Sequence, residues 1–139
     1  MKILNLERMR RRLERIPDAI RKRAKADLML AGREINMLQR SLAPKDDGLL
    51  AGTIRTEQLP DPEIGVEIKA GGPATTKPVR NSSKGNAPQY DYALAQEHGT
   101  ENMQANPFFY PAIRMKKKQA QRQVRVGVRR ALKDAVSGK

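Results

Sequence analysis

The stretch that decides the fold reads YDYALAQEHGTENMQANPFFYPAIR and covers residues 90–114. It holds all 3 tyrosines, both phenylalanines and the single histidine of a 139-residue chain that has no tryptophan. Aromatic rings bury more apolar area than most side chains do, so we expect this stretch to form the centre of a core. Its first part, residues 90–97, can form either a short helix or a turn followed by a strand. Gly99 then stands where the chain needs a positive φ, which glycine adopts without steric cost.

Two prolines flank the aromatic residues at the end of this stretch. Pro107 and Pro111 restrict the backbone on either side of the triplet Phe108-Phe109-Tyr110, and we expect the triplet to be extended. Pro111 also suits the first turn of a helix that follows it. Residues 89–114 are therefore predicted to form an aromatic hinge motif that leads into a long helix.

Helical periodicity is clear at both ends of the chain. Residues 5–42 are predicted to be helical with an interruption at Pro17, because a proline inside a helix removes a hydrogen bond. A basic helix over residues 111–136 has a thin stripe of alanine and valine, and Gly127 in it costs about 1 kcal/mol relative to alanine. The stripe in the N-terminal helix recurs at spacings of three and four: Ile20, Ala24, Leu28, Ala31, Ile35, Leu38 and Leu42.

The middle of the chain has the period of a β-strand. Residues 43–70 are predicted to form a hairpin, with strands over 53–58 and 63–69 and a turn between them. Residues 71–88 are rich in Gly, Pro, Ser and Thr, so we expect a mobile basic loop. Together the patterns predict a single α+β domain, residues 1–139. In it a long N-terminal helix packs on a small antiparallel sheet, with a basic C-terminal helix.

Charge is concentrated at the two ends of the chain. The net charge is +13, and residues 1–43 and 111–139 are strongly basic around a mildly acidic middle. Clustered cations favour a polyanion or an acidic protein surface as partner, although a solvated basic surface without a partner is the plain alternative. The residues expected to face DNA or a partner are in the C-terminal helix: Lys116, Lys117, Lys118, Arg122, Arg125, Arg129 and Arg130.

Catalytic and metal-binding chemistry is poorly represented. There is no cysteine, and a single histidine cannot form a two-histidine metal site, so no metal or cofactor is expected. Glu97 and His98 are adjacent in sequence and are expected to brace the turn at Gly99-Thr100, not to act as an acid–base pair. We therefore predict that the protein is not an enzyme. No run of 18 apolar residues is present, so no membrane span is expected.

The aromatic stretch also resembles a known protein family. Its motifs are similar to the YA…EhGT…PFf.PA signature of small head–tail joining proteins of long-tailed bacteriophages. These are neck or tail-completion proteins grouped with the lambda-type minor tail protein Z. A second element is similar to the family's aP..tG.L..si segment, with Asp47 where a small hydroxyl residue often stands. The matching pieces are Tyr92-Ala93, Glu97-His98-Gly99-Thr100, Asn106-Pro107-Phe108-Phe109-Tyr110-Pro111-Ala112, and, for the second element, Ala43-Pro44, Gly48-Leu49 and Ile54.

The resemblance implies a role and a set of partners. It implies a structural virion protein that joins the DNA-filled head to the tail as part of a ring of identical subunits, assembled in the bacterial host cytoplasm. The implied partners are further copies of the chain, neighbouring connector and tail-tube or tail-terminator proteins, and DNA that passes through weakly bound. The alternative is a non-specific DNA-binding protein. The motif residues with an implied assembly role are Tyr92, Glu97, Gly99, Thr100, Pro107, Phe108 and Pro111.

Overall fold

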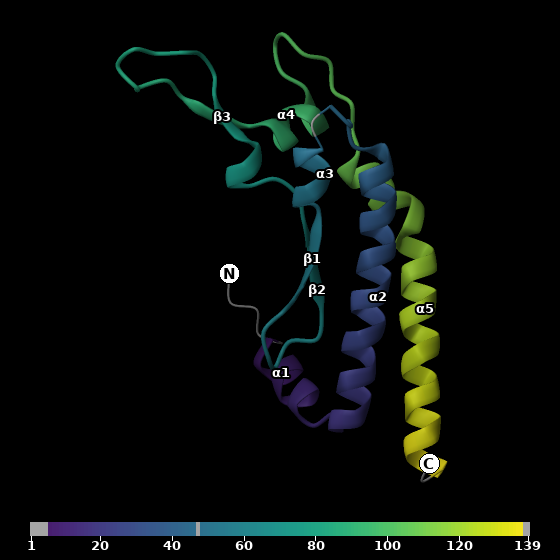
Figure 1. Ribbon diagram of the computed structural model, residues 1–139. Coiled ribbons are helices and arrows are strands. Elements are labelled where there is room, and N and C mark those ends of the chain that lie inside the picture. Colours follow the sequence, from purple (N-terminus) through teal and green to yellow (C-terminus); the bar gives the residue numbers. More distant parts are fainter. Residues whose placement is uncertain (1–5, 47, 138–139) are drawn as a thin grey trace. The chain divides into compact units, whose positions relative to one another are not determined.

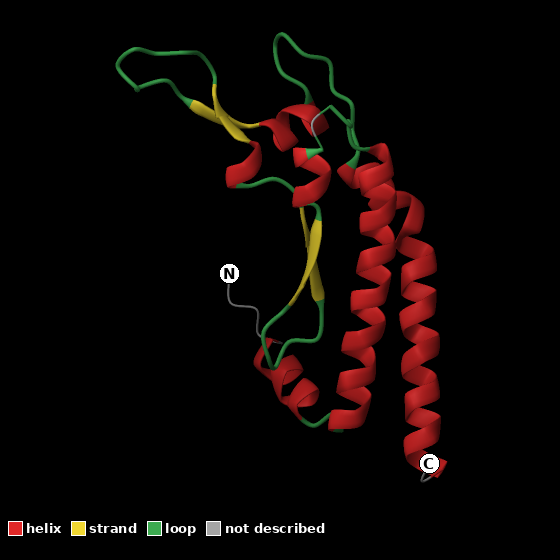
Figure 2. Cartoon of the chain, viewed as in Figure 1, coloured by secondary structure: helices red, strands yellow, loops and turns green. Residues whose placement is uncertain are grey.

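The computed structural model describes residues 6–46 and 48–137 (Figure 1). The fold is α+β, as the sequence predicted: a long helix packs on a small antiparallel sheet, and a second long helix ends the chain (Figure 2). The chain divides into two compact units. The first comprises Met1–Gly32, Thr56–Glu67 and Lys117–Lys139, and the second Arg33–Arg55 and Ile68–Lys116. Two positions with sequence-based expectations, Asn5 and Asp47, lie outside the described residues.

Two helices form the N-terminal part, α1 (Leu6–Glu14) and α2 (Asp18–Leu42). The interruption at Pro17 is confirmed, and the Pro17 carbonyl accepts a hydrogen bond of 3.0 Å from the backbone N–H of Ile20. The apolar stripe of α2 accounts for its buried face, because a helix is stabilised chiefly by packing such a stripe. The buried members of the stripe are Ile20, Ala24, Ala31 and Ile35.

The predicted hairpin is shorter than expected. A helix of 5 residues, α3 (Leu49–Thr53), precedes the strands β1 (Arg55–Gln58) and β2 (Val66–Lys69), which form a two-stranded sheet. The expectation that a strand begins at Thr53 is wrong. Its hydroxyl donates a hydrogen bond of 2.7 Å to the Leu50 carbonyl, a local contact that closes the last turn of α3.

The segment 71–88 contains more structure than its composition indicated. A 3₁₀ turn, η1 (Pro73–Thr75), leads into β3 (Thr76–Pro78), which pairs antiparallel with β4 (Gln89–Asp91). The expectation of a segment without regular structure is therefore wrong for residues 73–78. Thr75 explains the difference, because it is buried and its hydroxyl donates to Asp91 Oδ1 at 2.7 Å. Residues 79–88 have no helix or strand, and their mobility stays a prediction.

The aromatic stretch forms the end of β4, the helix α4 (Tyr92–His98) and the first turns of α5 (Phe109–Ser137). Of the two alternatives for residues 90–97, the short helix is confirmed from Tyr92 on, and a turn followed by a strand is not found. The prediction of an extended aromatic triplet is wrong, since Phe109 and Tyr110 are already in the first turn of α5. Pro111 fits there, because the N–H that it lacks has no acceptor in the first turn of a helix.

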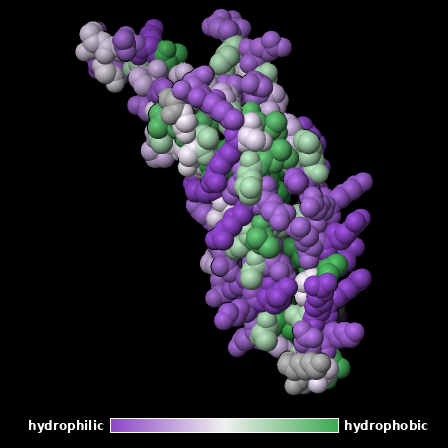
Figure 3. All heavy atoms as spheres, turned by 45° about the vertical axis from the view of Figure 1, so that its right-hand side comes forward, coloured by the Kyte–Doolittle hydropathy of each residue, from purple (hydrophilic) through white to green (hydrophobic). Residues whose placement is uncertain are grey.

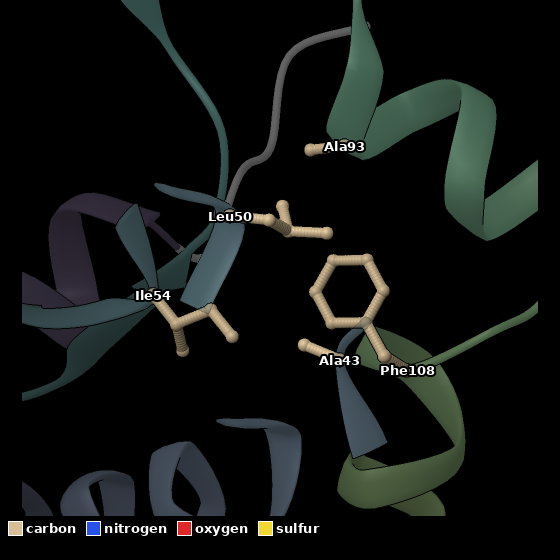
Figure 4. Close-up of a cluster of buried hydrophobic side chains, with 5 residues drawn as sticks. All are labelled: Ala43, Leu50, Ile54, Ala93 and Phe108. Carbon is tan, nitrogen blue, oxygen red and sulfur yellow. The ribbon is translucent and has the colours of Figure 1, made fainter. Parts of the chain in front are cut away.

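The main apolar cluster lies in the second unit. The Phe108 ring, which is 1 % exposed, points toward side chains from the end of α2, from α3 and from α4 (Figure 4). The aromatic stretch therefore does anchor a core, as predicted. The cluster consists of Ala43, Leu50, Ile54, Ala93 and Phe108.

Candidate functional site

The residues that carry the family resemblance lie together in the second unit, around the connection from α4 to α5. Tyr92 begins α4, and its hydroxyl donates to Asp46 Oδ2 at 3.5 Å. Gly99 follows the end of α4, and the backbone N–H of Thr100 donates to the Met103 carbonyl at 2.8 Å. The structure thus brings the separate motifs to one connection. Its later part holds Pro107 and Phe108, and Pro111 lies in the first turn of α5.

Glu97 is the central residue of this connection. Its carboxylate accepts hydrogen bonds from the backbone N–H groups of Phe108, Phe109 and Tyr110 at 2.8, 2.9 and 3.0 Å. The first N–H groups of a helix have no partner within the helix. Pro111 lacks an N–H, so Glu97 satisfies each donor at the start of α5. The expectation that Glu97 braces the Gly99-Thr100 turn is therefore wrong. Glu97 caps a helix that begins 12 residues later.

The same contacts determine the ionisation of Glu97. Burial of the side chain opposes its negative charge, but the three backbone N–H groups and the nearby His98 outweigh this effect. The pKa of Glu97 is therefore below its ordinary value. The positive end of the α5 dipole acts in the same direction. Glu97 is thus held as a carboxylate at neutral pH, with both oxygens engaged in backbone hydrogen bonds.

Gly99 has the backbone conformation that the sequence predicted. Its φ is 78°, in the region that side chains with a Cβ rarely adopt. A Cβ at this position would lie 2.9 Å from the Ala105 N atom and 3.0 Å from the Met103 carbonyl oxygen. Glycine is therefore needed both for the conformation and for the close approach of the loop that leads to α5.

Asp91 is a second organising carboxylate, which sequence reasoning missed. It precedes α4 and accepts a hydrogen bond of 2.8 Å from the Ala93 N–H, as a helix N-cap does. The other oxygen accepts from the Gly72 N–H at 3.2 Å, so Asp91 joins α4 to the turn η1. An aspartate directly before a predicted short helix is the local signal that could have identified the cap.

A groove of about 500 Å³ opens beside these residues in the second unit. Asp91, Glu97, His98 and Tyr110 are among its lining residues, and the His98 and Tyr110 ring centroids are 6.4 Å apart. Since both carboxylates accept hydrogen bonds from backbone groups, their contacts hold the fold together. Within residues 6–46 and 48–137, no three His, Cys, Asp or Glu side chains are grouped as metal ligands.

The cations predicted to face a partner lie along α5. Lys116 is half-buried and the other six are exposed. Figure 3, which brings the side of α5 forward, shows mainly hydrophilic side chains along this helix. Four of the six recur at helical spacing, so they form one stripe, which we call the cationic stripe. Its members are Lys118, Arg122, Arg125 and Arg129, with Lys117 and Arg130 on the flanks.

A contact between α2 and α5 in the first unit was not foreseen. Gly127 is buried, and a Cβ there would lie 1.8 Å from Asp27 Oδ2. The Asp27 carboxylate also accepts a hydrogen bond of 3.1 Å from Arg23 Nε. Gly127 is thus the position at which an acidic side chain of α2 approaches the α5 backbone. The interpretation of Gly127 as only a weak point in the helix is incomplete.

No helix in the described part of the chain is long and apolar enough to cross a membrane.

The chain was compared with known proteins at three levels. The family, the partners and the virion location stay predictions that depend on the motifs, because no family model, curated protein or solved structure matches this chain.

Proposed function

We propose that this protein is a structural component of the joint between the head and the tail of a long-tailed bacteriophage, and that it acts as a ring of identical subunits. The motif residues support this proposal through what they do locally. They fix the start of α5 and, through Phe108, attach it to the core of the second unit. A motif of this kind fixes where a long helix begins, so each identical subunit of a ring would present that helix in the same position.

The geometry of Glu97 is the observation that carries the proposal. A catalytic carboxylate needs an oxygen that can exchange a proton with a substrate. In this site Oε2 accepts from two backbone N–H groups and Oε1 from a third. We therefore propose that the motif has a structural role and that the protein is not an enzyme.

The exposed cations of α5 supply the proposed contacts with partners. In the assembled joint the cationic stripe faces either DNA that passes through the ring or an acidic surface of a neighbouring connector or tail protein. Passing DNA has to move, so contacts to its backbone have to be weak and independent of sequence. The proposed location is the virion, with assembly in the cytoplasm of the bacterial host.

Deletion of the gene in the host that produces the particles tests this proposal. We expect DNA-filled heads and separate tails in electron micrographs, and recovery of joined particles when the wild-type gene is supplied. Glu97→Gln should restore joining poorly, whereas Glu101→Gln, an exposed acidic residue of the adjacent loop, should restore it fully. Normal numbers of joined particles without the gene would refute the proposal.

A non-specific DNA-binding protein is the second candidate, and the charge of α5 favours it. The two candidates differ in what the isolated subunit does. A DNA-binding protein binds DNA tightly as a monomer, whereas a joint protein assembles with itself and with neighbouring rings. Binding and assembly have therefore to be measured at the same physiological salt concentration.

A further inference from the structure

The first unit contains a small recess between α2 and α5. Its volume is about 310 Å³, and side chains from both helices line it. It lies beside the contact of Asp27 with Gly127 and differs from the motif groove, which belongs to the second unit. We call it the arginine recess. The lining residues that matter are Arg23, Asp27, Arg122, Val126, Gly127 and Arg130.

Three arginines are arranged around one carboxylate in the arginine recess. Arg23 and Asp27 are one turn apart on α2 and form a salt bridge of 3.1 Å. Arg122 and Arg130 are separated by eight positions on α5, which is about 12 Å along a helix. They therefore line the recess on either side of Gly127, where Asp27 approaches.

The charges of the recess do not balance. Asp27 is its one acidic lining residue, and its carboxylate already pairs with Arg23. Within the part of the chain that the structure describes, neither Arg122 nor Arg130 makes a hydrogen bond or a salt bridge. Guanidinium groups stay protonated at neutral pH, so two positive charges remain uncompensated at one recess. An anion between these side chains relieves their repulsion.

We propose that the arginine recess binds a backbone phosphate of nucleic acid. The planar guanidinium group matches phosphate oxygens through paired hydrogen bonds, and two helices supply it here from different directions. The segments of the first unit hold 18 basic and 9 acidic residues, so a polyanion is attracted along the whole unit. This inference rests on the proposed function, because it gives the DNA contact of the ring a defined position.

Asp27 has a specific effect in this site. Its negative charge lies in the recess and competes with a phosphate for Arg23. It therefore limits affinity, as is needed where DNA passes and is not retained. The structure thus assigns Arg122 and Arg130 to phosphate binding and Asp27 to weakening it. Removal of the Asp27 charge should increase affinity, which a purely structural role for Asp27 does not predict.

A matched pair of double variants tests the site. Arg122→Gln with Arg130→Gln removes the two unpaired arginines of the recess. Arg8→Gln with Arg11→Gln removes the same charge from two exposed positions of the same unit, outside the recess and outside the cationic stripe. Binding to a short fluorescent DNA duplex is measured by anisotropy at several salt concentrations. Circular dichroism confirms that each variant is folded.

The recess double variant should reduce the slope of log affinity against log salt by about one, because one phosphate contact is lost, and should lower the affinity at low salt about tenfold. The control double variant should change the slope by less than about 0.3. Asp27→Asn should increase the affinity about threefold, since it removes a repulsive charge near the phosphate. Equal losses of affinity for the two double variants would show general electrostatic attraction without a defined phosphate site. Unchanged affinity of Asp27→Asn would show that Asp27 does not weaken DNA binding.

Competition experiments distinguish the possible sources of the anion. Inorganic pyrophosphate should compete with the duplex in the wild type and not in the recess double variant. Two other polyanions are tested in the same way, phosphatidylglycerol vesicles and polyglutamate. Tighter binding of either one than of DNA, with the same dependence on Arg122 and Arg130, would overturn the assignment to nucleic acid. If the recess double variant loses DNA binding while heads and tails still join, phosphate binding by the recess is supported and its role in joining is refuted. If joining is lost while DNA binding is unchanged, phosphate binding by the recess is refuted and the proposed joining function is still supported.

Discussion

Each of the two units uses an acidic side chain at α5, and they do so in opposite ways. In the second unit the Glu97 carboxylate accepts hydrogen bonds from three backbone N–H groups at the start of α5, and Glu97 is 8 % exposed. In the first unit Asp27 approaches the middle of α5 at Gly127 and pairs with Arg23, a surface residue. Glu97 therefore pairs with backbone N–H groups of α5, whereas Asp27 neutralises the charge of only one of the nearby arginines.

This difference indicates how the chain divides its tasks. A buried cap next to an aromatic ring fixes the backbone, so substitutions in the second unit should change the free energy of unfolding. A helix contact built on glycine and on charged side chains leaves cations at the surface, so substitutions in the first unit should mainly change binding.

The largest effect is expected for Phe108→Ala. The ring is 1 % exposed within the cluster of the second unit, and truncating a buried phenylalanine costs about 3–5 kcal/mol. Chemical denaturation should report this loss. Tyr110→Ala is the control, because Tyr110 is 50 % exposed and should cost less than about 1 kcal/mol. Equal losses for the two variants would mean that the core is not centred on Phe108.

Glu97→Gln should lower the free energy of unfolding by about 2 kcal/mol, because a neutral amide replaces a charged acceptor of three N–H groups. The pKa of Glu97 is lowered in the folded state, so its contribution is complete above the unfolded pKa and is lost as the pH falls through the folded pKa. The wild type should therefore lose more stability in acid than the variant does. Parallel pH profiles of the two proteins would contradict this assignment.

Gly99→Val should destabilise the protein by about 1–2 kcal/mol, since a Cβ disfavours the φ of 78° and meets the backbone of Ala105. Gly52→Ala in α3 is the matched control, because a Cβ there meets no atom within 4 Å. Thermal unfolding distinguishes the two glycines. A Gly99→Val variant with the melting temperature of the wild type would show that the α4–α5 connection tolerates a different backbone conformation.

The smallest effect is expected at Gly127, where two terms oppose each other. Alanine favours a helix by about 1 kcal/mol over glycine, but its Cβ would displace the Asp27 carboxylate. We expect Gly127→Ala to lower the stability of the wild type by roughly 1 kcal/mol and to raise that of an Asp27→Ala variant by a similar amount. A double-mutant cycle measures the coupling. Additive effects would place Asp27 away from Gly127.

Sequence reasoning succeeded where the signal is local. The stripe of α2 and the alternation of β2 are periodic patterns in neighbouring residues, and the positive φ of Gly99 follows from glycine after a short helix. It failed where the partner is distant along the chain. The N–H groups that Glu97 caps are 11 to 13 residues away, and Asp27 and Gly127 are a hundred residues apart. Such pairs cannot be identified from the composition of either segment.

The short elements were missed for a related reason. The strand β3 is only 3 residues long, and its pairing with β4 depends on Asp91, which holds Thr75 and the Gly72 N–H in place. Proline and glycine in the segment favoured a loop on average, but one buried hydroxyl and one carboxylate decided the structure of residues 73–78. Long-range hydrogen bonds therefore outweighed local propensity here.

The most direct test of the account is to measure self-assembly and DNA binding on one preparation at physiological salt. Native mass spectrometry reports the oligomeric state, and fluorescence anisotropy with duplexes of different sequence reports affinity and specificity. We expect discrete oligomers and negligible DNA binding. At lower salt we expect sequence-independent binding with a log–log salt slope of about −4.5, as for about five phosphate contacts. Nanomolar DNA binding by a monomer at physiological salt, whether or not it depends on sequence, would contradict a joint protein and favour a DNA-binding protein.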